Sequence, residues 1–140
     1  MIKTGIQTID NSLNGGIKEK AKVLIISNPE IEKLQFAQQI TYTNLKDGHN
    51  VIYITNNKKS SILKSRFKEY EWDISKFEKN KRCRIIDLYE RVLKKEDIKK
   101  IQKDIEDSMK KNSSESVIVI DSLSSFLEIY GTKKRSTRKY

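Results

Sequence analysis

The sequence has 140 residues, which is enough for one compact domain with a hydrophobic core and too few for two conventional domains. Hydrophobic residues make up 36% and charged residues 34% of the chain, a balance typical of globular rather than disordered proteins. The formal net charge is +10, but five of the cations stand in residues 132–140, which hold no acidic residue. We therefore expect one folded domain over residues 1–131 and a basic, disordered tail over residues 132–140.

The composition also argues against several classes of protein. The single cysteine, Cys83, cannot form an intramolecular disulfide, and the single histidine, His49, has no metal-ligand cluster around it. No apolar run reaches the 18 residues that a membrane-spanning helix needs, and the amino terminus is polar and interrupted by glycine. We expect a cytoplasmic protein with no bound metal and no membrane partner.

Four short apolar runs predict strands. They are rich in β-branched residues and nearly continuous in apolar character, which is typical of strands covered on both faces of a parallel sheet. These runs are residues 23–27, 51–55, 83–88 and 117–121.

Three segments between these runs have the spacing of helices, namely residues 34–45, 60–70 and 92–109. Strands that alternate with helices predict an α/β fold with a mostly parallel β-sheet flanked by helices. Ligands of such sheets bind beyond the carboxyl ends of the strands. The segments that follow Ser27, Thr55 and Asp121 are therefore the candidate functional regions.

Three strings in chain order resemble the KaiC family of RecA-like ATPases. They are T-G-I-x-x-I-D-x-x-L-x-G-G-I over residues 4–17, Y-x-W-D-I over residues 70–74 with R-I-I-D-L over residues 84–88, and VIVIDSLSSFLEIYG over residues 117–131. Their common order is much more specific than any one string. The resemblance implies a RecA-like P-loop NTPase fold, and an unrelated flavodoxin-like or Rossmann-like sheet is the alternative.

Members of this family continue well beyond the strand that carries the Walker B aspartate, so the resemblance implies a truncated domain. In related folds one further strand lies between the Walker A strand and the Walker B strand, which correspond here to residues 23–27 and 117–121. Without it, these two strands must pair directly or leave an open edge. Because an exposed apolar edge invites another chain, we expect a protein partner or a homo-oligomer.

The resemblance places the phosphate-binding loop on residues 27–34. Such a loop needs glycines whose backbone N–H groups close around phosphate, a lysine, and a hydroxyl for Mg²⁺. Only Lys33 survives, because Ser27, Glu30 and Glu32 replace the glycines and Leu34 replaces the hydroxyl residue. Like charges about 4 Å apart repel by roughly 4 kcal/mol at an effective dielectric of about 20. We therefore expect no tight MgATP binding, and Ser27-x-x-Glu30 instead has the spacing of a capping box.

The catalytic carboxylates of the family are also replaced. Where active members carry a pair of glutamates after the second strand, this sequence has Asn57 and Lys58, neither of which takes a proton from water near neutral pH. Asp121 matches the Walker B aspartate, and it has a structural alternative as a cap of the following helix. No catalytic residue is therefore assigned, and Lys33 and Asp121 remain as the residual nucleotide positions.

These departures predict a catalytically inactive KaiC/RecA-like domain that acts as a binding or regulatory module, for example in signal transduction, with no cofactor. Two alternatives stay open. The first is an ATP-binding protein or slow ATPase that uses ATP and Mg²⁺ through Lys33 and Asp121. The second is a basic recombinase paralogue that binds nucleic acid through residues 132–140, since clustered cations gain from counterion release.

Overall fold

The computed structural model describes residues 1–26, 30–56, 58–111, 116–124, 126 and 127. Its centre is a three-stranded sheet with the order β2-β1-β3. The strands are β1 (Asn50–Thr55), β2 (Cys83–Asp87) and β3 (Ser116–Asp121). Both pairings are parallel, and Val51 of β1 lies opposite Cys83 on one side and Val117 on the other. The predicted α/β class is confirmed.

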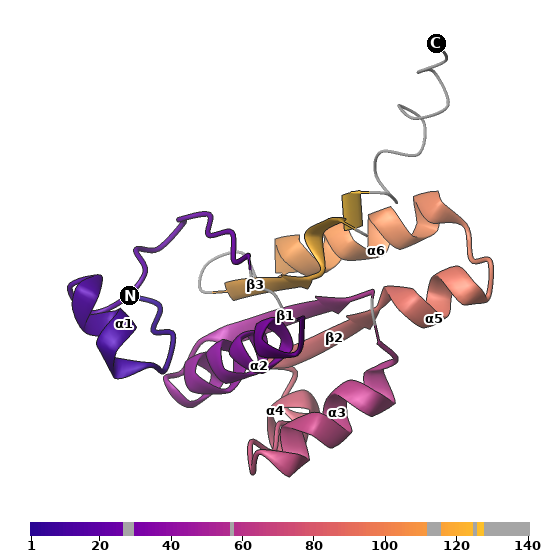
Figure 1. The fold of residues 1–140 in the computed structure, drawn as a ribbon. Helices are drawn as coiled ribbons and strands as arrows, with labels where there is room; N and C mark the ends of the chain where they lie inside the picture. Colours follow the sequence, from indigo (N-terminus) through magenta and orange to yellow (C-terminus); the bar gives the residue numbers. More distant parts are fainter. Residues whose placement is uncertain (27–29, 57, 112–115, 125, 128–140) are drawn as a thin grey trace.

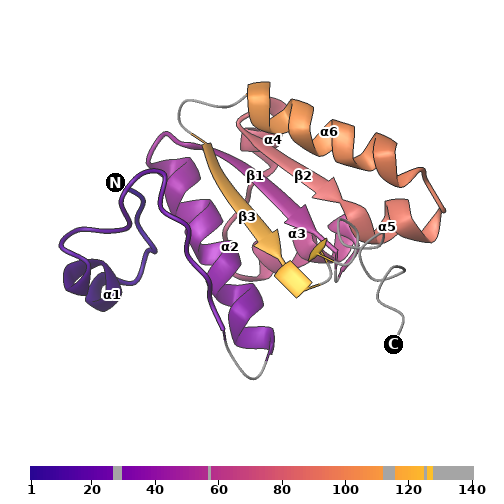
Figure 2. The same ribbon diagram turned by 90° about the horizontal axis from the view of Figure 1, so that it is seen from above.

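Helices cover both faces of this sheet (Figure 1; Figure 2). They are α1 (Gln7–Ser12), α2 (Glu30–Lys46), α3 (Ser60–Glu69), α4 (Ser75–Lys79), α5 (Leu88–Leu93) and α6 (Ile98–Lys111). One hydrophobic cluster joins α2, α3 and α4 to the sheet, and a second joins α5 and α6 to its other face. Helix α1 lies apart from the sheet, at the end of α2.

The central strand divides its side chains between the two clusters. Val51 and Tyr53 belong to the cluster under α2 and α3, whereas Ile52 and Ile54 belong to the cluster under α6. This division follows from the two-residue period of a strand, in which successive side chains point to opposite faces. The Tyr53 ring meets the ring of Phe67 edge to face, with centroids 6.3 Å apart. A nearly continuous apolar run is thus explained by burial on both faces.

The predicted helical segment 92–109 is divided into α5 and α6. Helix α5 ends at Leu93, and Lys95 has a φ of 55°, a left-handed conformation that commonly ends a helix. The residues of this segment therefore do not share one buried face. Ile101 and Ile105 are fully buried on α6, while Val92 is exposed.

The prediction of a strand over residues 23–27 is wrong over the part that the structure describes. Residues 21–26 form no strand, and the apolar side chains from Val23 to Ile26 are between 37% and 84% exposed. Ser27 lies outside the described residues. A strand needs a neighbour because its backbone N–H and C=O groups must be paired in a ladder. Within the described residues, β3 pairs only with β1. The edge of the sheet at β3 is therefore open there, and residues 23–26 do not pair directly with β3.

The amino-terminal segment is held by the residues of the first family string. The Asp10 carboxylate accepts hydrogen bonds from the backbone N–H and the hydroxyl of Thr4, both at 2.8 Å, and from the Gly5 N–H at 3.2 Å. Gly16 has a φ of 144°, and a Cβ there would lie 2.6 Å from the Ile2 carbonyl oxygen. The string is therefore explained by local structure.

The Cys83 thiol should be unreactive in the folded protein. Cys83 is buried at the start of β2, and desolvation, aided by the nearby Glu78 carboxylate, raises the pKa of its thiol to about 12. Since only the thiolate is a good nucleophile, we expect iodoacetamide at pH 8 to label Cys83 in urea but not in buffer. Mass spectrometry measures this directly, and rapid labelling of the native protein would contradict the burial of β2.

Candidate functional site

The carboxyl ends of the three strands meet at one edge of the sheet. By register, Thr55 at the end of β1 lies opposite Asp87 of β2 and opposite Asp121 of β3. The structure thus brings together two of the predicted regions, the one after Thr55 and the one after Asp121. The third, after Ser27, begins with residues outside the described part of the chain.

Asp121 is bonded to a buried phenol. The Tyr53 hydroxyl donates a hydrogen bond to Oδ2 of Asp121 at 3.2 Å, and the Tyr53 side chain is fully buried. Burial, together with the Asp121 charge, raises the pKa of Tyr53 well above its ordinary value near 10. The phenol therefore stays protonated and remains a donor to the carboxylate across the physiological pH range. Sequence reasoning missed this contact, although a tyrosine inside an apolar run signals a need for a buried polar partner.

Asn56 connects the end of β1 to the chain that follows β3. Its backbone N–H donates to the Asp121 carbonyl at 3.0 Å, which extends the ladder by one residue. Its side-chain amide donates to the Ser122 carbonyl at 2.9 Å and accepts from the Ser122 N–H at 2.8 Å. This reciprocal pair holds the two segments together. Sequence reasoning could not predict this pair, because the partners are 66 residues apart.

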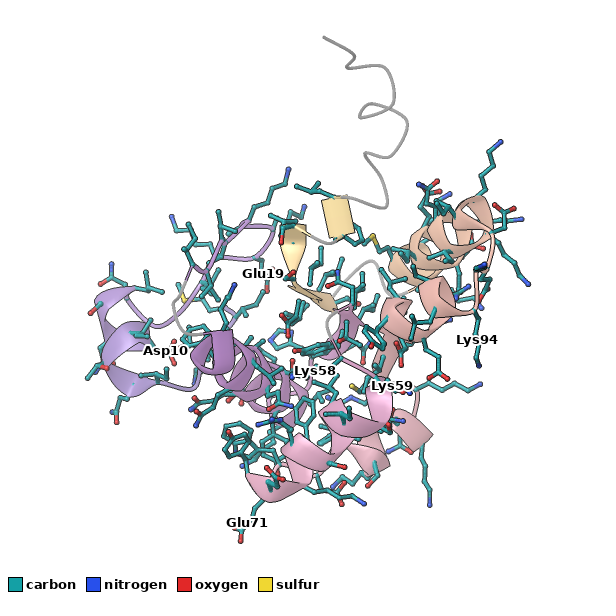
Figure 3. All side chains as sticks on the ribbon, turned by 45° about the vertical axis from the view of Figure 1, so that its right-hand side comes forward. Asp10, Glu19, Lys58, Lys59, Glu71 and Lys94 are labelled. Carbon is teal, nitrogen blue, oxygen red and sulfur yellow. The ribbon has the colours of Figure 1, made fainter. Side chains whose placement is uncertain are left out.

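The turn after β1 is closed by Thr55. Its buried hydroxyl donates to the Lys58 carbonyl at 3.0 Å. Figure 3 marks Lys58 and Lys59 on this turn between β1 and α3, well separated from Asp10 on α1. Asn57, the other position at which active relatives would carry a glutamate, lies outside the described residues. At Lys58 the side chain is half-buried, and its carbonyl fixes the turn.

Asp87 joins two helix starts. Oδ2 of its carboxylate accepts from the Ser60 N–H at 2.7 Å, at the start of α3, and Oδ1 accepts from the Glu90 N–H at 2.9 Å, in the first turn of α5. Sequence reasoning placed Asp87 within a strand and did not give it a role. The spacing Asp87-x-x-Glu90, which is that of an N-terminal cap, was the available signal.

The expected phosphate-binding region is described only from α2 onward. Leu34 stands where the resemblance places the hydroxyl residue that binds Mg²⁺. Its side chain is 6% exposed and belongs to the cluster that includes Leu45 and Val51. Lys33 is half-buried beside it. The carboxylates of Glu30 and Glu32 and the capping box of Ser27 fall where the structure describes no side chains, so these expectations remain predictions.

Taken together, the groups at this edge are bonded to one another. The described side chains include no group of three or more His, Cys, Asp and Glu residues that could hold a metal ion. In the same part of the chain, no helix is both long and apolar enough to cross a membrane. The arrangement can fix loops and helix starts. The carboxylates at the strand ends are those of Asp87 and Asp121, and both accept hydrogen bonds from other residues of this edge.

Known proteins are similar to this chain over 63% to 98% of its length. The UPF0273 protein SSO1861 of Saccharolobus solfataricus is 28% identical over 149 aligned positions, covering 98% of this chain and 52% of the relative. The UPF0273 protein of Thermotoga maritima is 33% identical over 88 residues, or 63% of this chain and 36% of the relative. This chain thus spans between 36% and 52% of the length of these relatives. A family model described as the KaiC ATPase matches residues 2–140, and the chain therefore belongs to the KaiC ATPase family.

Proposed function

We propose that this chain is a KaiC-family domain that does not hydrolyse ATP and acts as a binding or regulatory module. The observation that carries the proposal is the burial of Leu34. Its side chain is 6% exposed and packs in the main hydrophobic cluster, at the position where a family ATPase would present a hydroxyl to Mg²⁺. A hydrocarbon side chain has no oxygen for a hard cation, and turning it toward a ligand would open a cavity in the core.

The bonding at the carboxyl edge of the sheet supports the same proposal. Asn56 uses both atoms of its amide on Ser122, and the Asp121 carboxylate receives the Tyr53 hydroxyl. A water-activating base must reach the attacking water with an unprotonated, basic group. At the corresponding turn, Lys58 supplies an ammonium group instead. Binding of MgATP at this edge would compete with the hydrogen bonds that Asn56 and Asp121 already make.

The proposal is tested by thermal unfolding with and without millimolar MgATP. A ligand that prefers the folded state must stabilise it, by about 2.7 kcal/mol at a concentration one hundred times its Kd. We expect no change in Tm and no release of phosphate. Lys33→Ala is the matched variant, because it removes the one surviving Walker A residue, and its Tm should be equally insensitive to MgATP.

The opposite result is equally clear. An increase in Tm with MgATP that Lys33→Ala abolishes would establish the alternative of an ATP-binding protein that uses Lys33 and Asp121. Phosphate release that depends on Lys33 would establish a slow ATPase. Phosphate release would overturn the proposal of a non-hydrolysing module, and an increase in Tm alone would overturn the expectation that the domain does not bind MgATP tightly.

A further inference from the structure

Helix α5 buries one apolar side chain and exposes the rest. Leu88 is fully buried in the cluster that joins α5 and α6 to the sheet. Three other apolar residues of the helix, between 36% and 60% exposed, are Tyr89, Val92 and Leu93. Their spacing of three and four residues places them on one face of the helix. Single exposed apolar residues are ordinary, but a contiguous group marks an interaction surface. We call these three residues the α5 patch.

The helix that carries the α5 patch is fixed in place by Arg91. The Arg91 guanidinium donates to both carboxylate oxygens of Glu96, at 2.8 and 3.1 Å, and to Asp104 of α6 at 2.6 Å. The Arg91 side chain is only 20% exposed, so these bonds are largely shielded from water. The start of α5 is held by Asp87, which accepts the Glu90 N–H. A surface that is already fixed loses less conformational entropy when it binds a partner.

The surroundings of the α5 patch carry more positive than negative charge. Four lysines follow it in the chain, namely Lys94, Lys95, Lys99 and Lys100. The carboxylates of this stretch are already engaged, since Glu96 bonds to Arg91, Glu90 lies 3.4 Å from Lys94, and Asp97 accepts the Lys99 N–H at 3.1 Å. Among the described residues, only Lys94 of the four lysines forms an ion pair. The α5 patch therefore has a basic rim.

The α5 patch and its rim face outward. Figure 1 shows α5 and α6 at the opposite side of the molecule from α1. Figure 3 labels Lys94 at the end of α5, pointing away from the sheet. Helix α5 follows β2, which is the edge strand opposite β3 in the order β2-β1-β3. The α5 patch is thus separate from the carboxyl ends of β1 and β3, where the residual nucleotide position Asp121 lies.

We propose that the α5 patch binds an acidic amphipathic helix of a protein partner. Such a helix would place its own apolar side chains, at the same spacing of three and four residues, against Tyr89, Val92 and Leu93. Its flanking carboxylates would face the lysines of the rim, which favours an acidic partner over others. The proposal names a surface and a class of partner for the proposed binding module, and it rests on that function.

Two other occupants fit the α5 patch less well. A second copy of this chain would bring the same lysines against the rim, and two chains of net charge +10 repel each other. An anionic membrane would attract the lysines, but a flat anionic surface would also meet the Glu90 carboxylate, whose side chain is 42% exposed on the same helix. A partner helix can place its acidic residues beside the lysines alone.

The test is binding of a fluorescein-labelled peptide to the full chain, measured by fluorescence anisotropy without nucleotide. The peptide has about 18 residues, with leucine at helical spacing and glutamate, glutamine and alanine elsewhere. We expect saturable one-to-one binding and slower hydrogen exchange in α5. A scrambled peptide of the same composition, which lacks the leucine stripe, should bind at least about tenfold more weakly. Absence of binding, or equal binding of both peptides, would overturn the proposal.

Substitutions locate the binding surface. Leu93→Glu should weaken peptide binding by about tenfold or more, because it places a carboxylate in the α5 patch where an acidic partner must dock. Ile62→Glu is the matched control, since Ile62 is an exposed residue of α3 and the change in charge is the same. It should bind normally. If Leu93→Glu fails to fold by circular dichroism, Val92→Gln at the 47% exposed neighbouring position replaces it and should also weaken binding.

Further outcomes separate the other occupants and the proposed function. Binding of phosphatidylserine vesicles that Leu93→Glu abolishes, without binding of the peptide, would identify a membrane surface and overturn the proposal. A dimer of this chain that Leu93→Glu dissociates would overturn it in favour of a second copy. A chain that binds the peptide but releases phosphate from ATP would overturn the non-hydrolysing role and leave the α5 patch as a docking surface.

Discussion

Replacing Leu34 by alanine is expected to lower the free energy of unfolding by about 2–5 kcal/mol. Leu34 is 6% exposed and belongs to the hydrophobic cluster between α2 and the sheet, which also contains Leu45 and Val51. Truncation removes buried methyl groups and leaves a cavity that a packed helix and sheet fill only in part. Urea denaturation monitored by circular dichroism measures the change. The slope of the free energy of unfolding against urea concentration should be the same for the variant and the unmodified protein.

Lys33→Ala is the matched control for this measurement. Lys33 precedes Leu34 on the same helix, is only half-buried and has the same helical backbone. A substitution there should change the free energy of unfolding by about 0.5 kcal/mol or less, because alanine is a good helix former and no core packing is lost. If Leu34→Ala were as mild as Lys33→Ala, the side chain at the magnesium position would not belong to the core, and the main support for a non-hydrolysing domain would be lost.

The sequence predicted the elements whose stability depends on apolar pattern. Strands β1, β2 and β3 appear where β-branched runs stand, and α2 and α3 appear where apolar residues recur at helical spacing. Each of these signals reports burial, and burial is what the sheet and its two helical layers provide. The alternation of strands and helices was therefore sufficient to predict a parallel α/β sheet.

The same reasoning failed for residues 23–26 because a strand is not a local structure. Their composition favours an extended chain, but only a neighbouring strand can pair the backbone, and none lies beside them in the described part of the chain. Helix α1 was missed for the opposite reason. It has no buried residue and is anchored by Asp10 to Thr4 and Gly5, so it has no apolar pattern to detect.

The candidate site was predicted in place but not in its bonding. Thr55 and Asp121 lie together at the carboxyl edge of the sheet, as expected for parallel strands. Their partners could not be predicted, because the Tyr53 hydroxyl meets Asp121 across 68 residues of sequence and Asn56 meets Ser122 across 66. Contacts of this kind depend on the register between strands, which a single sequence does not specify.

Replacing Asp87 by alanine is expected to lower the free energy of unfolding by about 2 kcal/mol. Its carboxylate accepts the Ser60 N–H at the start of α3 and the Glu90 N–H at the start of α5, and each lost cap of this kind costs about 1 kcal/mol. Urea denaturation measures the total loss in free energy of unfolding. Hydrogen exchange at the Ser60 and Glu90 amides shows that the loss arises at the two helix starts, since both amides should exchange faster in the variant.

Asp87→Asn removes the charge and one of the two acceptor oxygens. The amide keeps one acceptor oxygen, so it can cap one of the two helices, and the loss should be about half that of Asp87→Ala. A loss below about 0.5 kcal/mol for the alanine variant would contradict the double cap. The carboxylate would then be available to a ligand at the edge of the sheet beside Thr55, where sheets of this type bind their ligands. A loss near 2 kcal/mol would instead support a structural role for this carboxylate at the two helix starts.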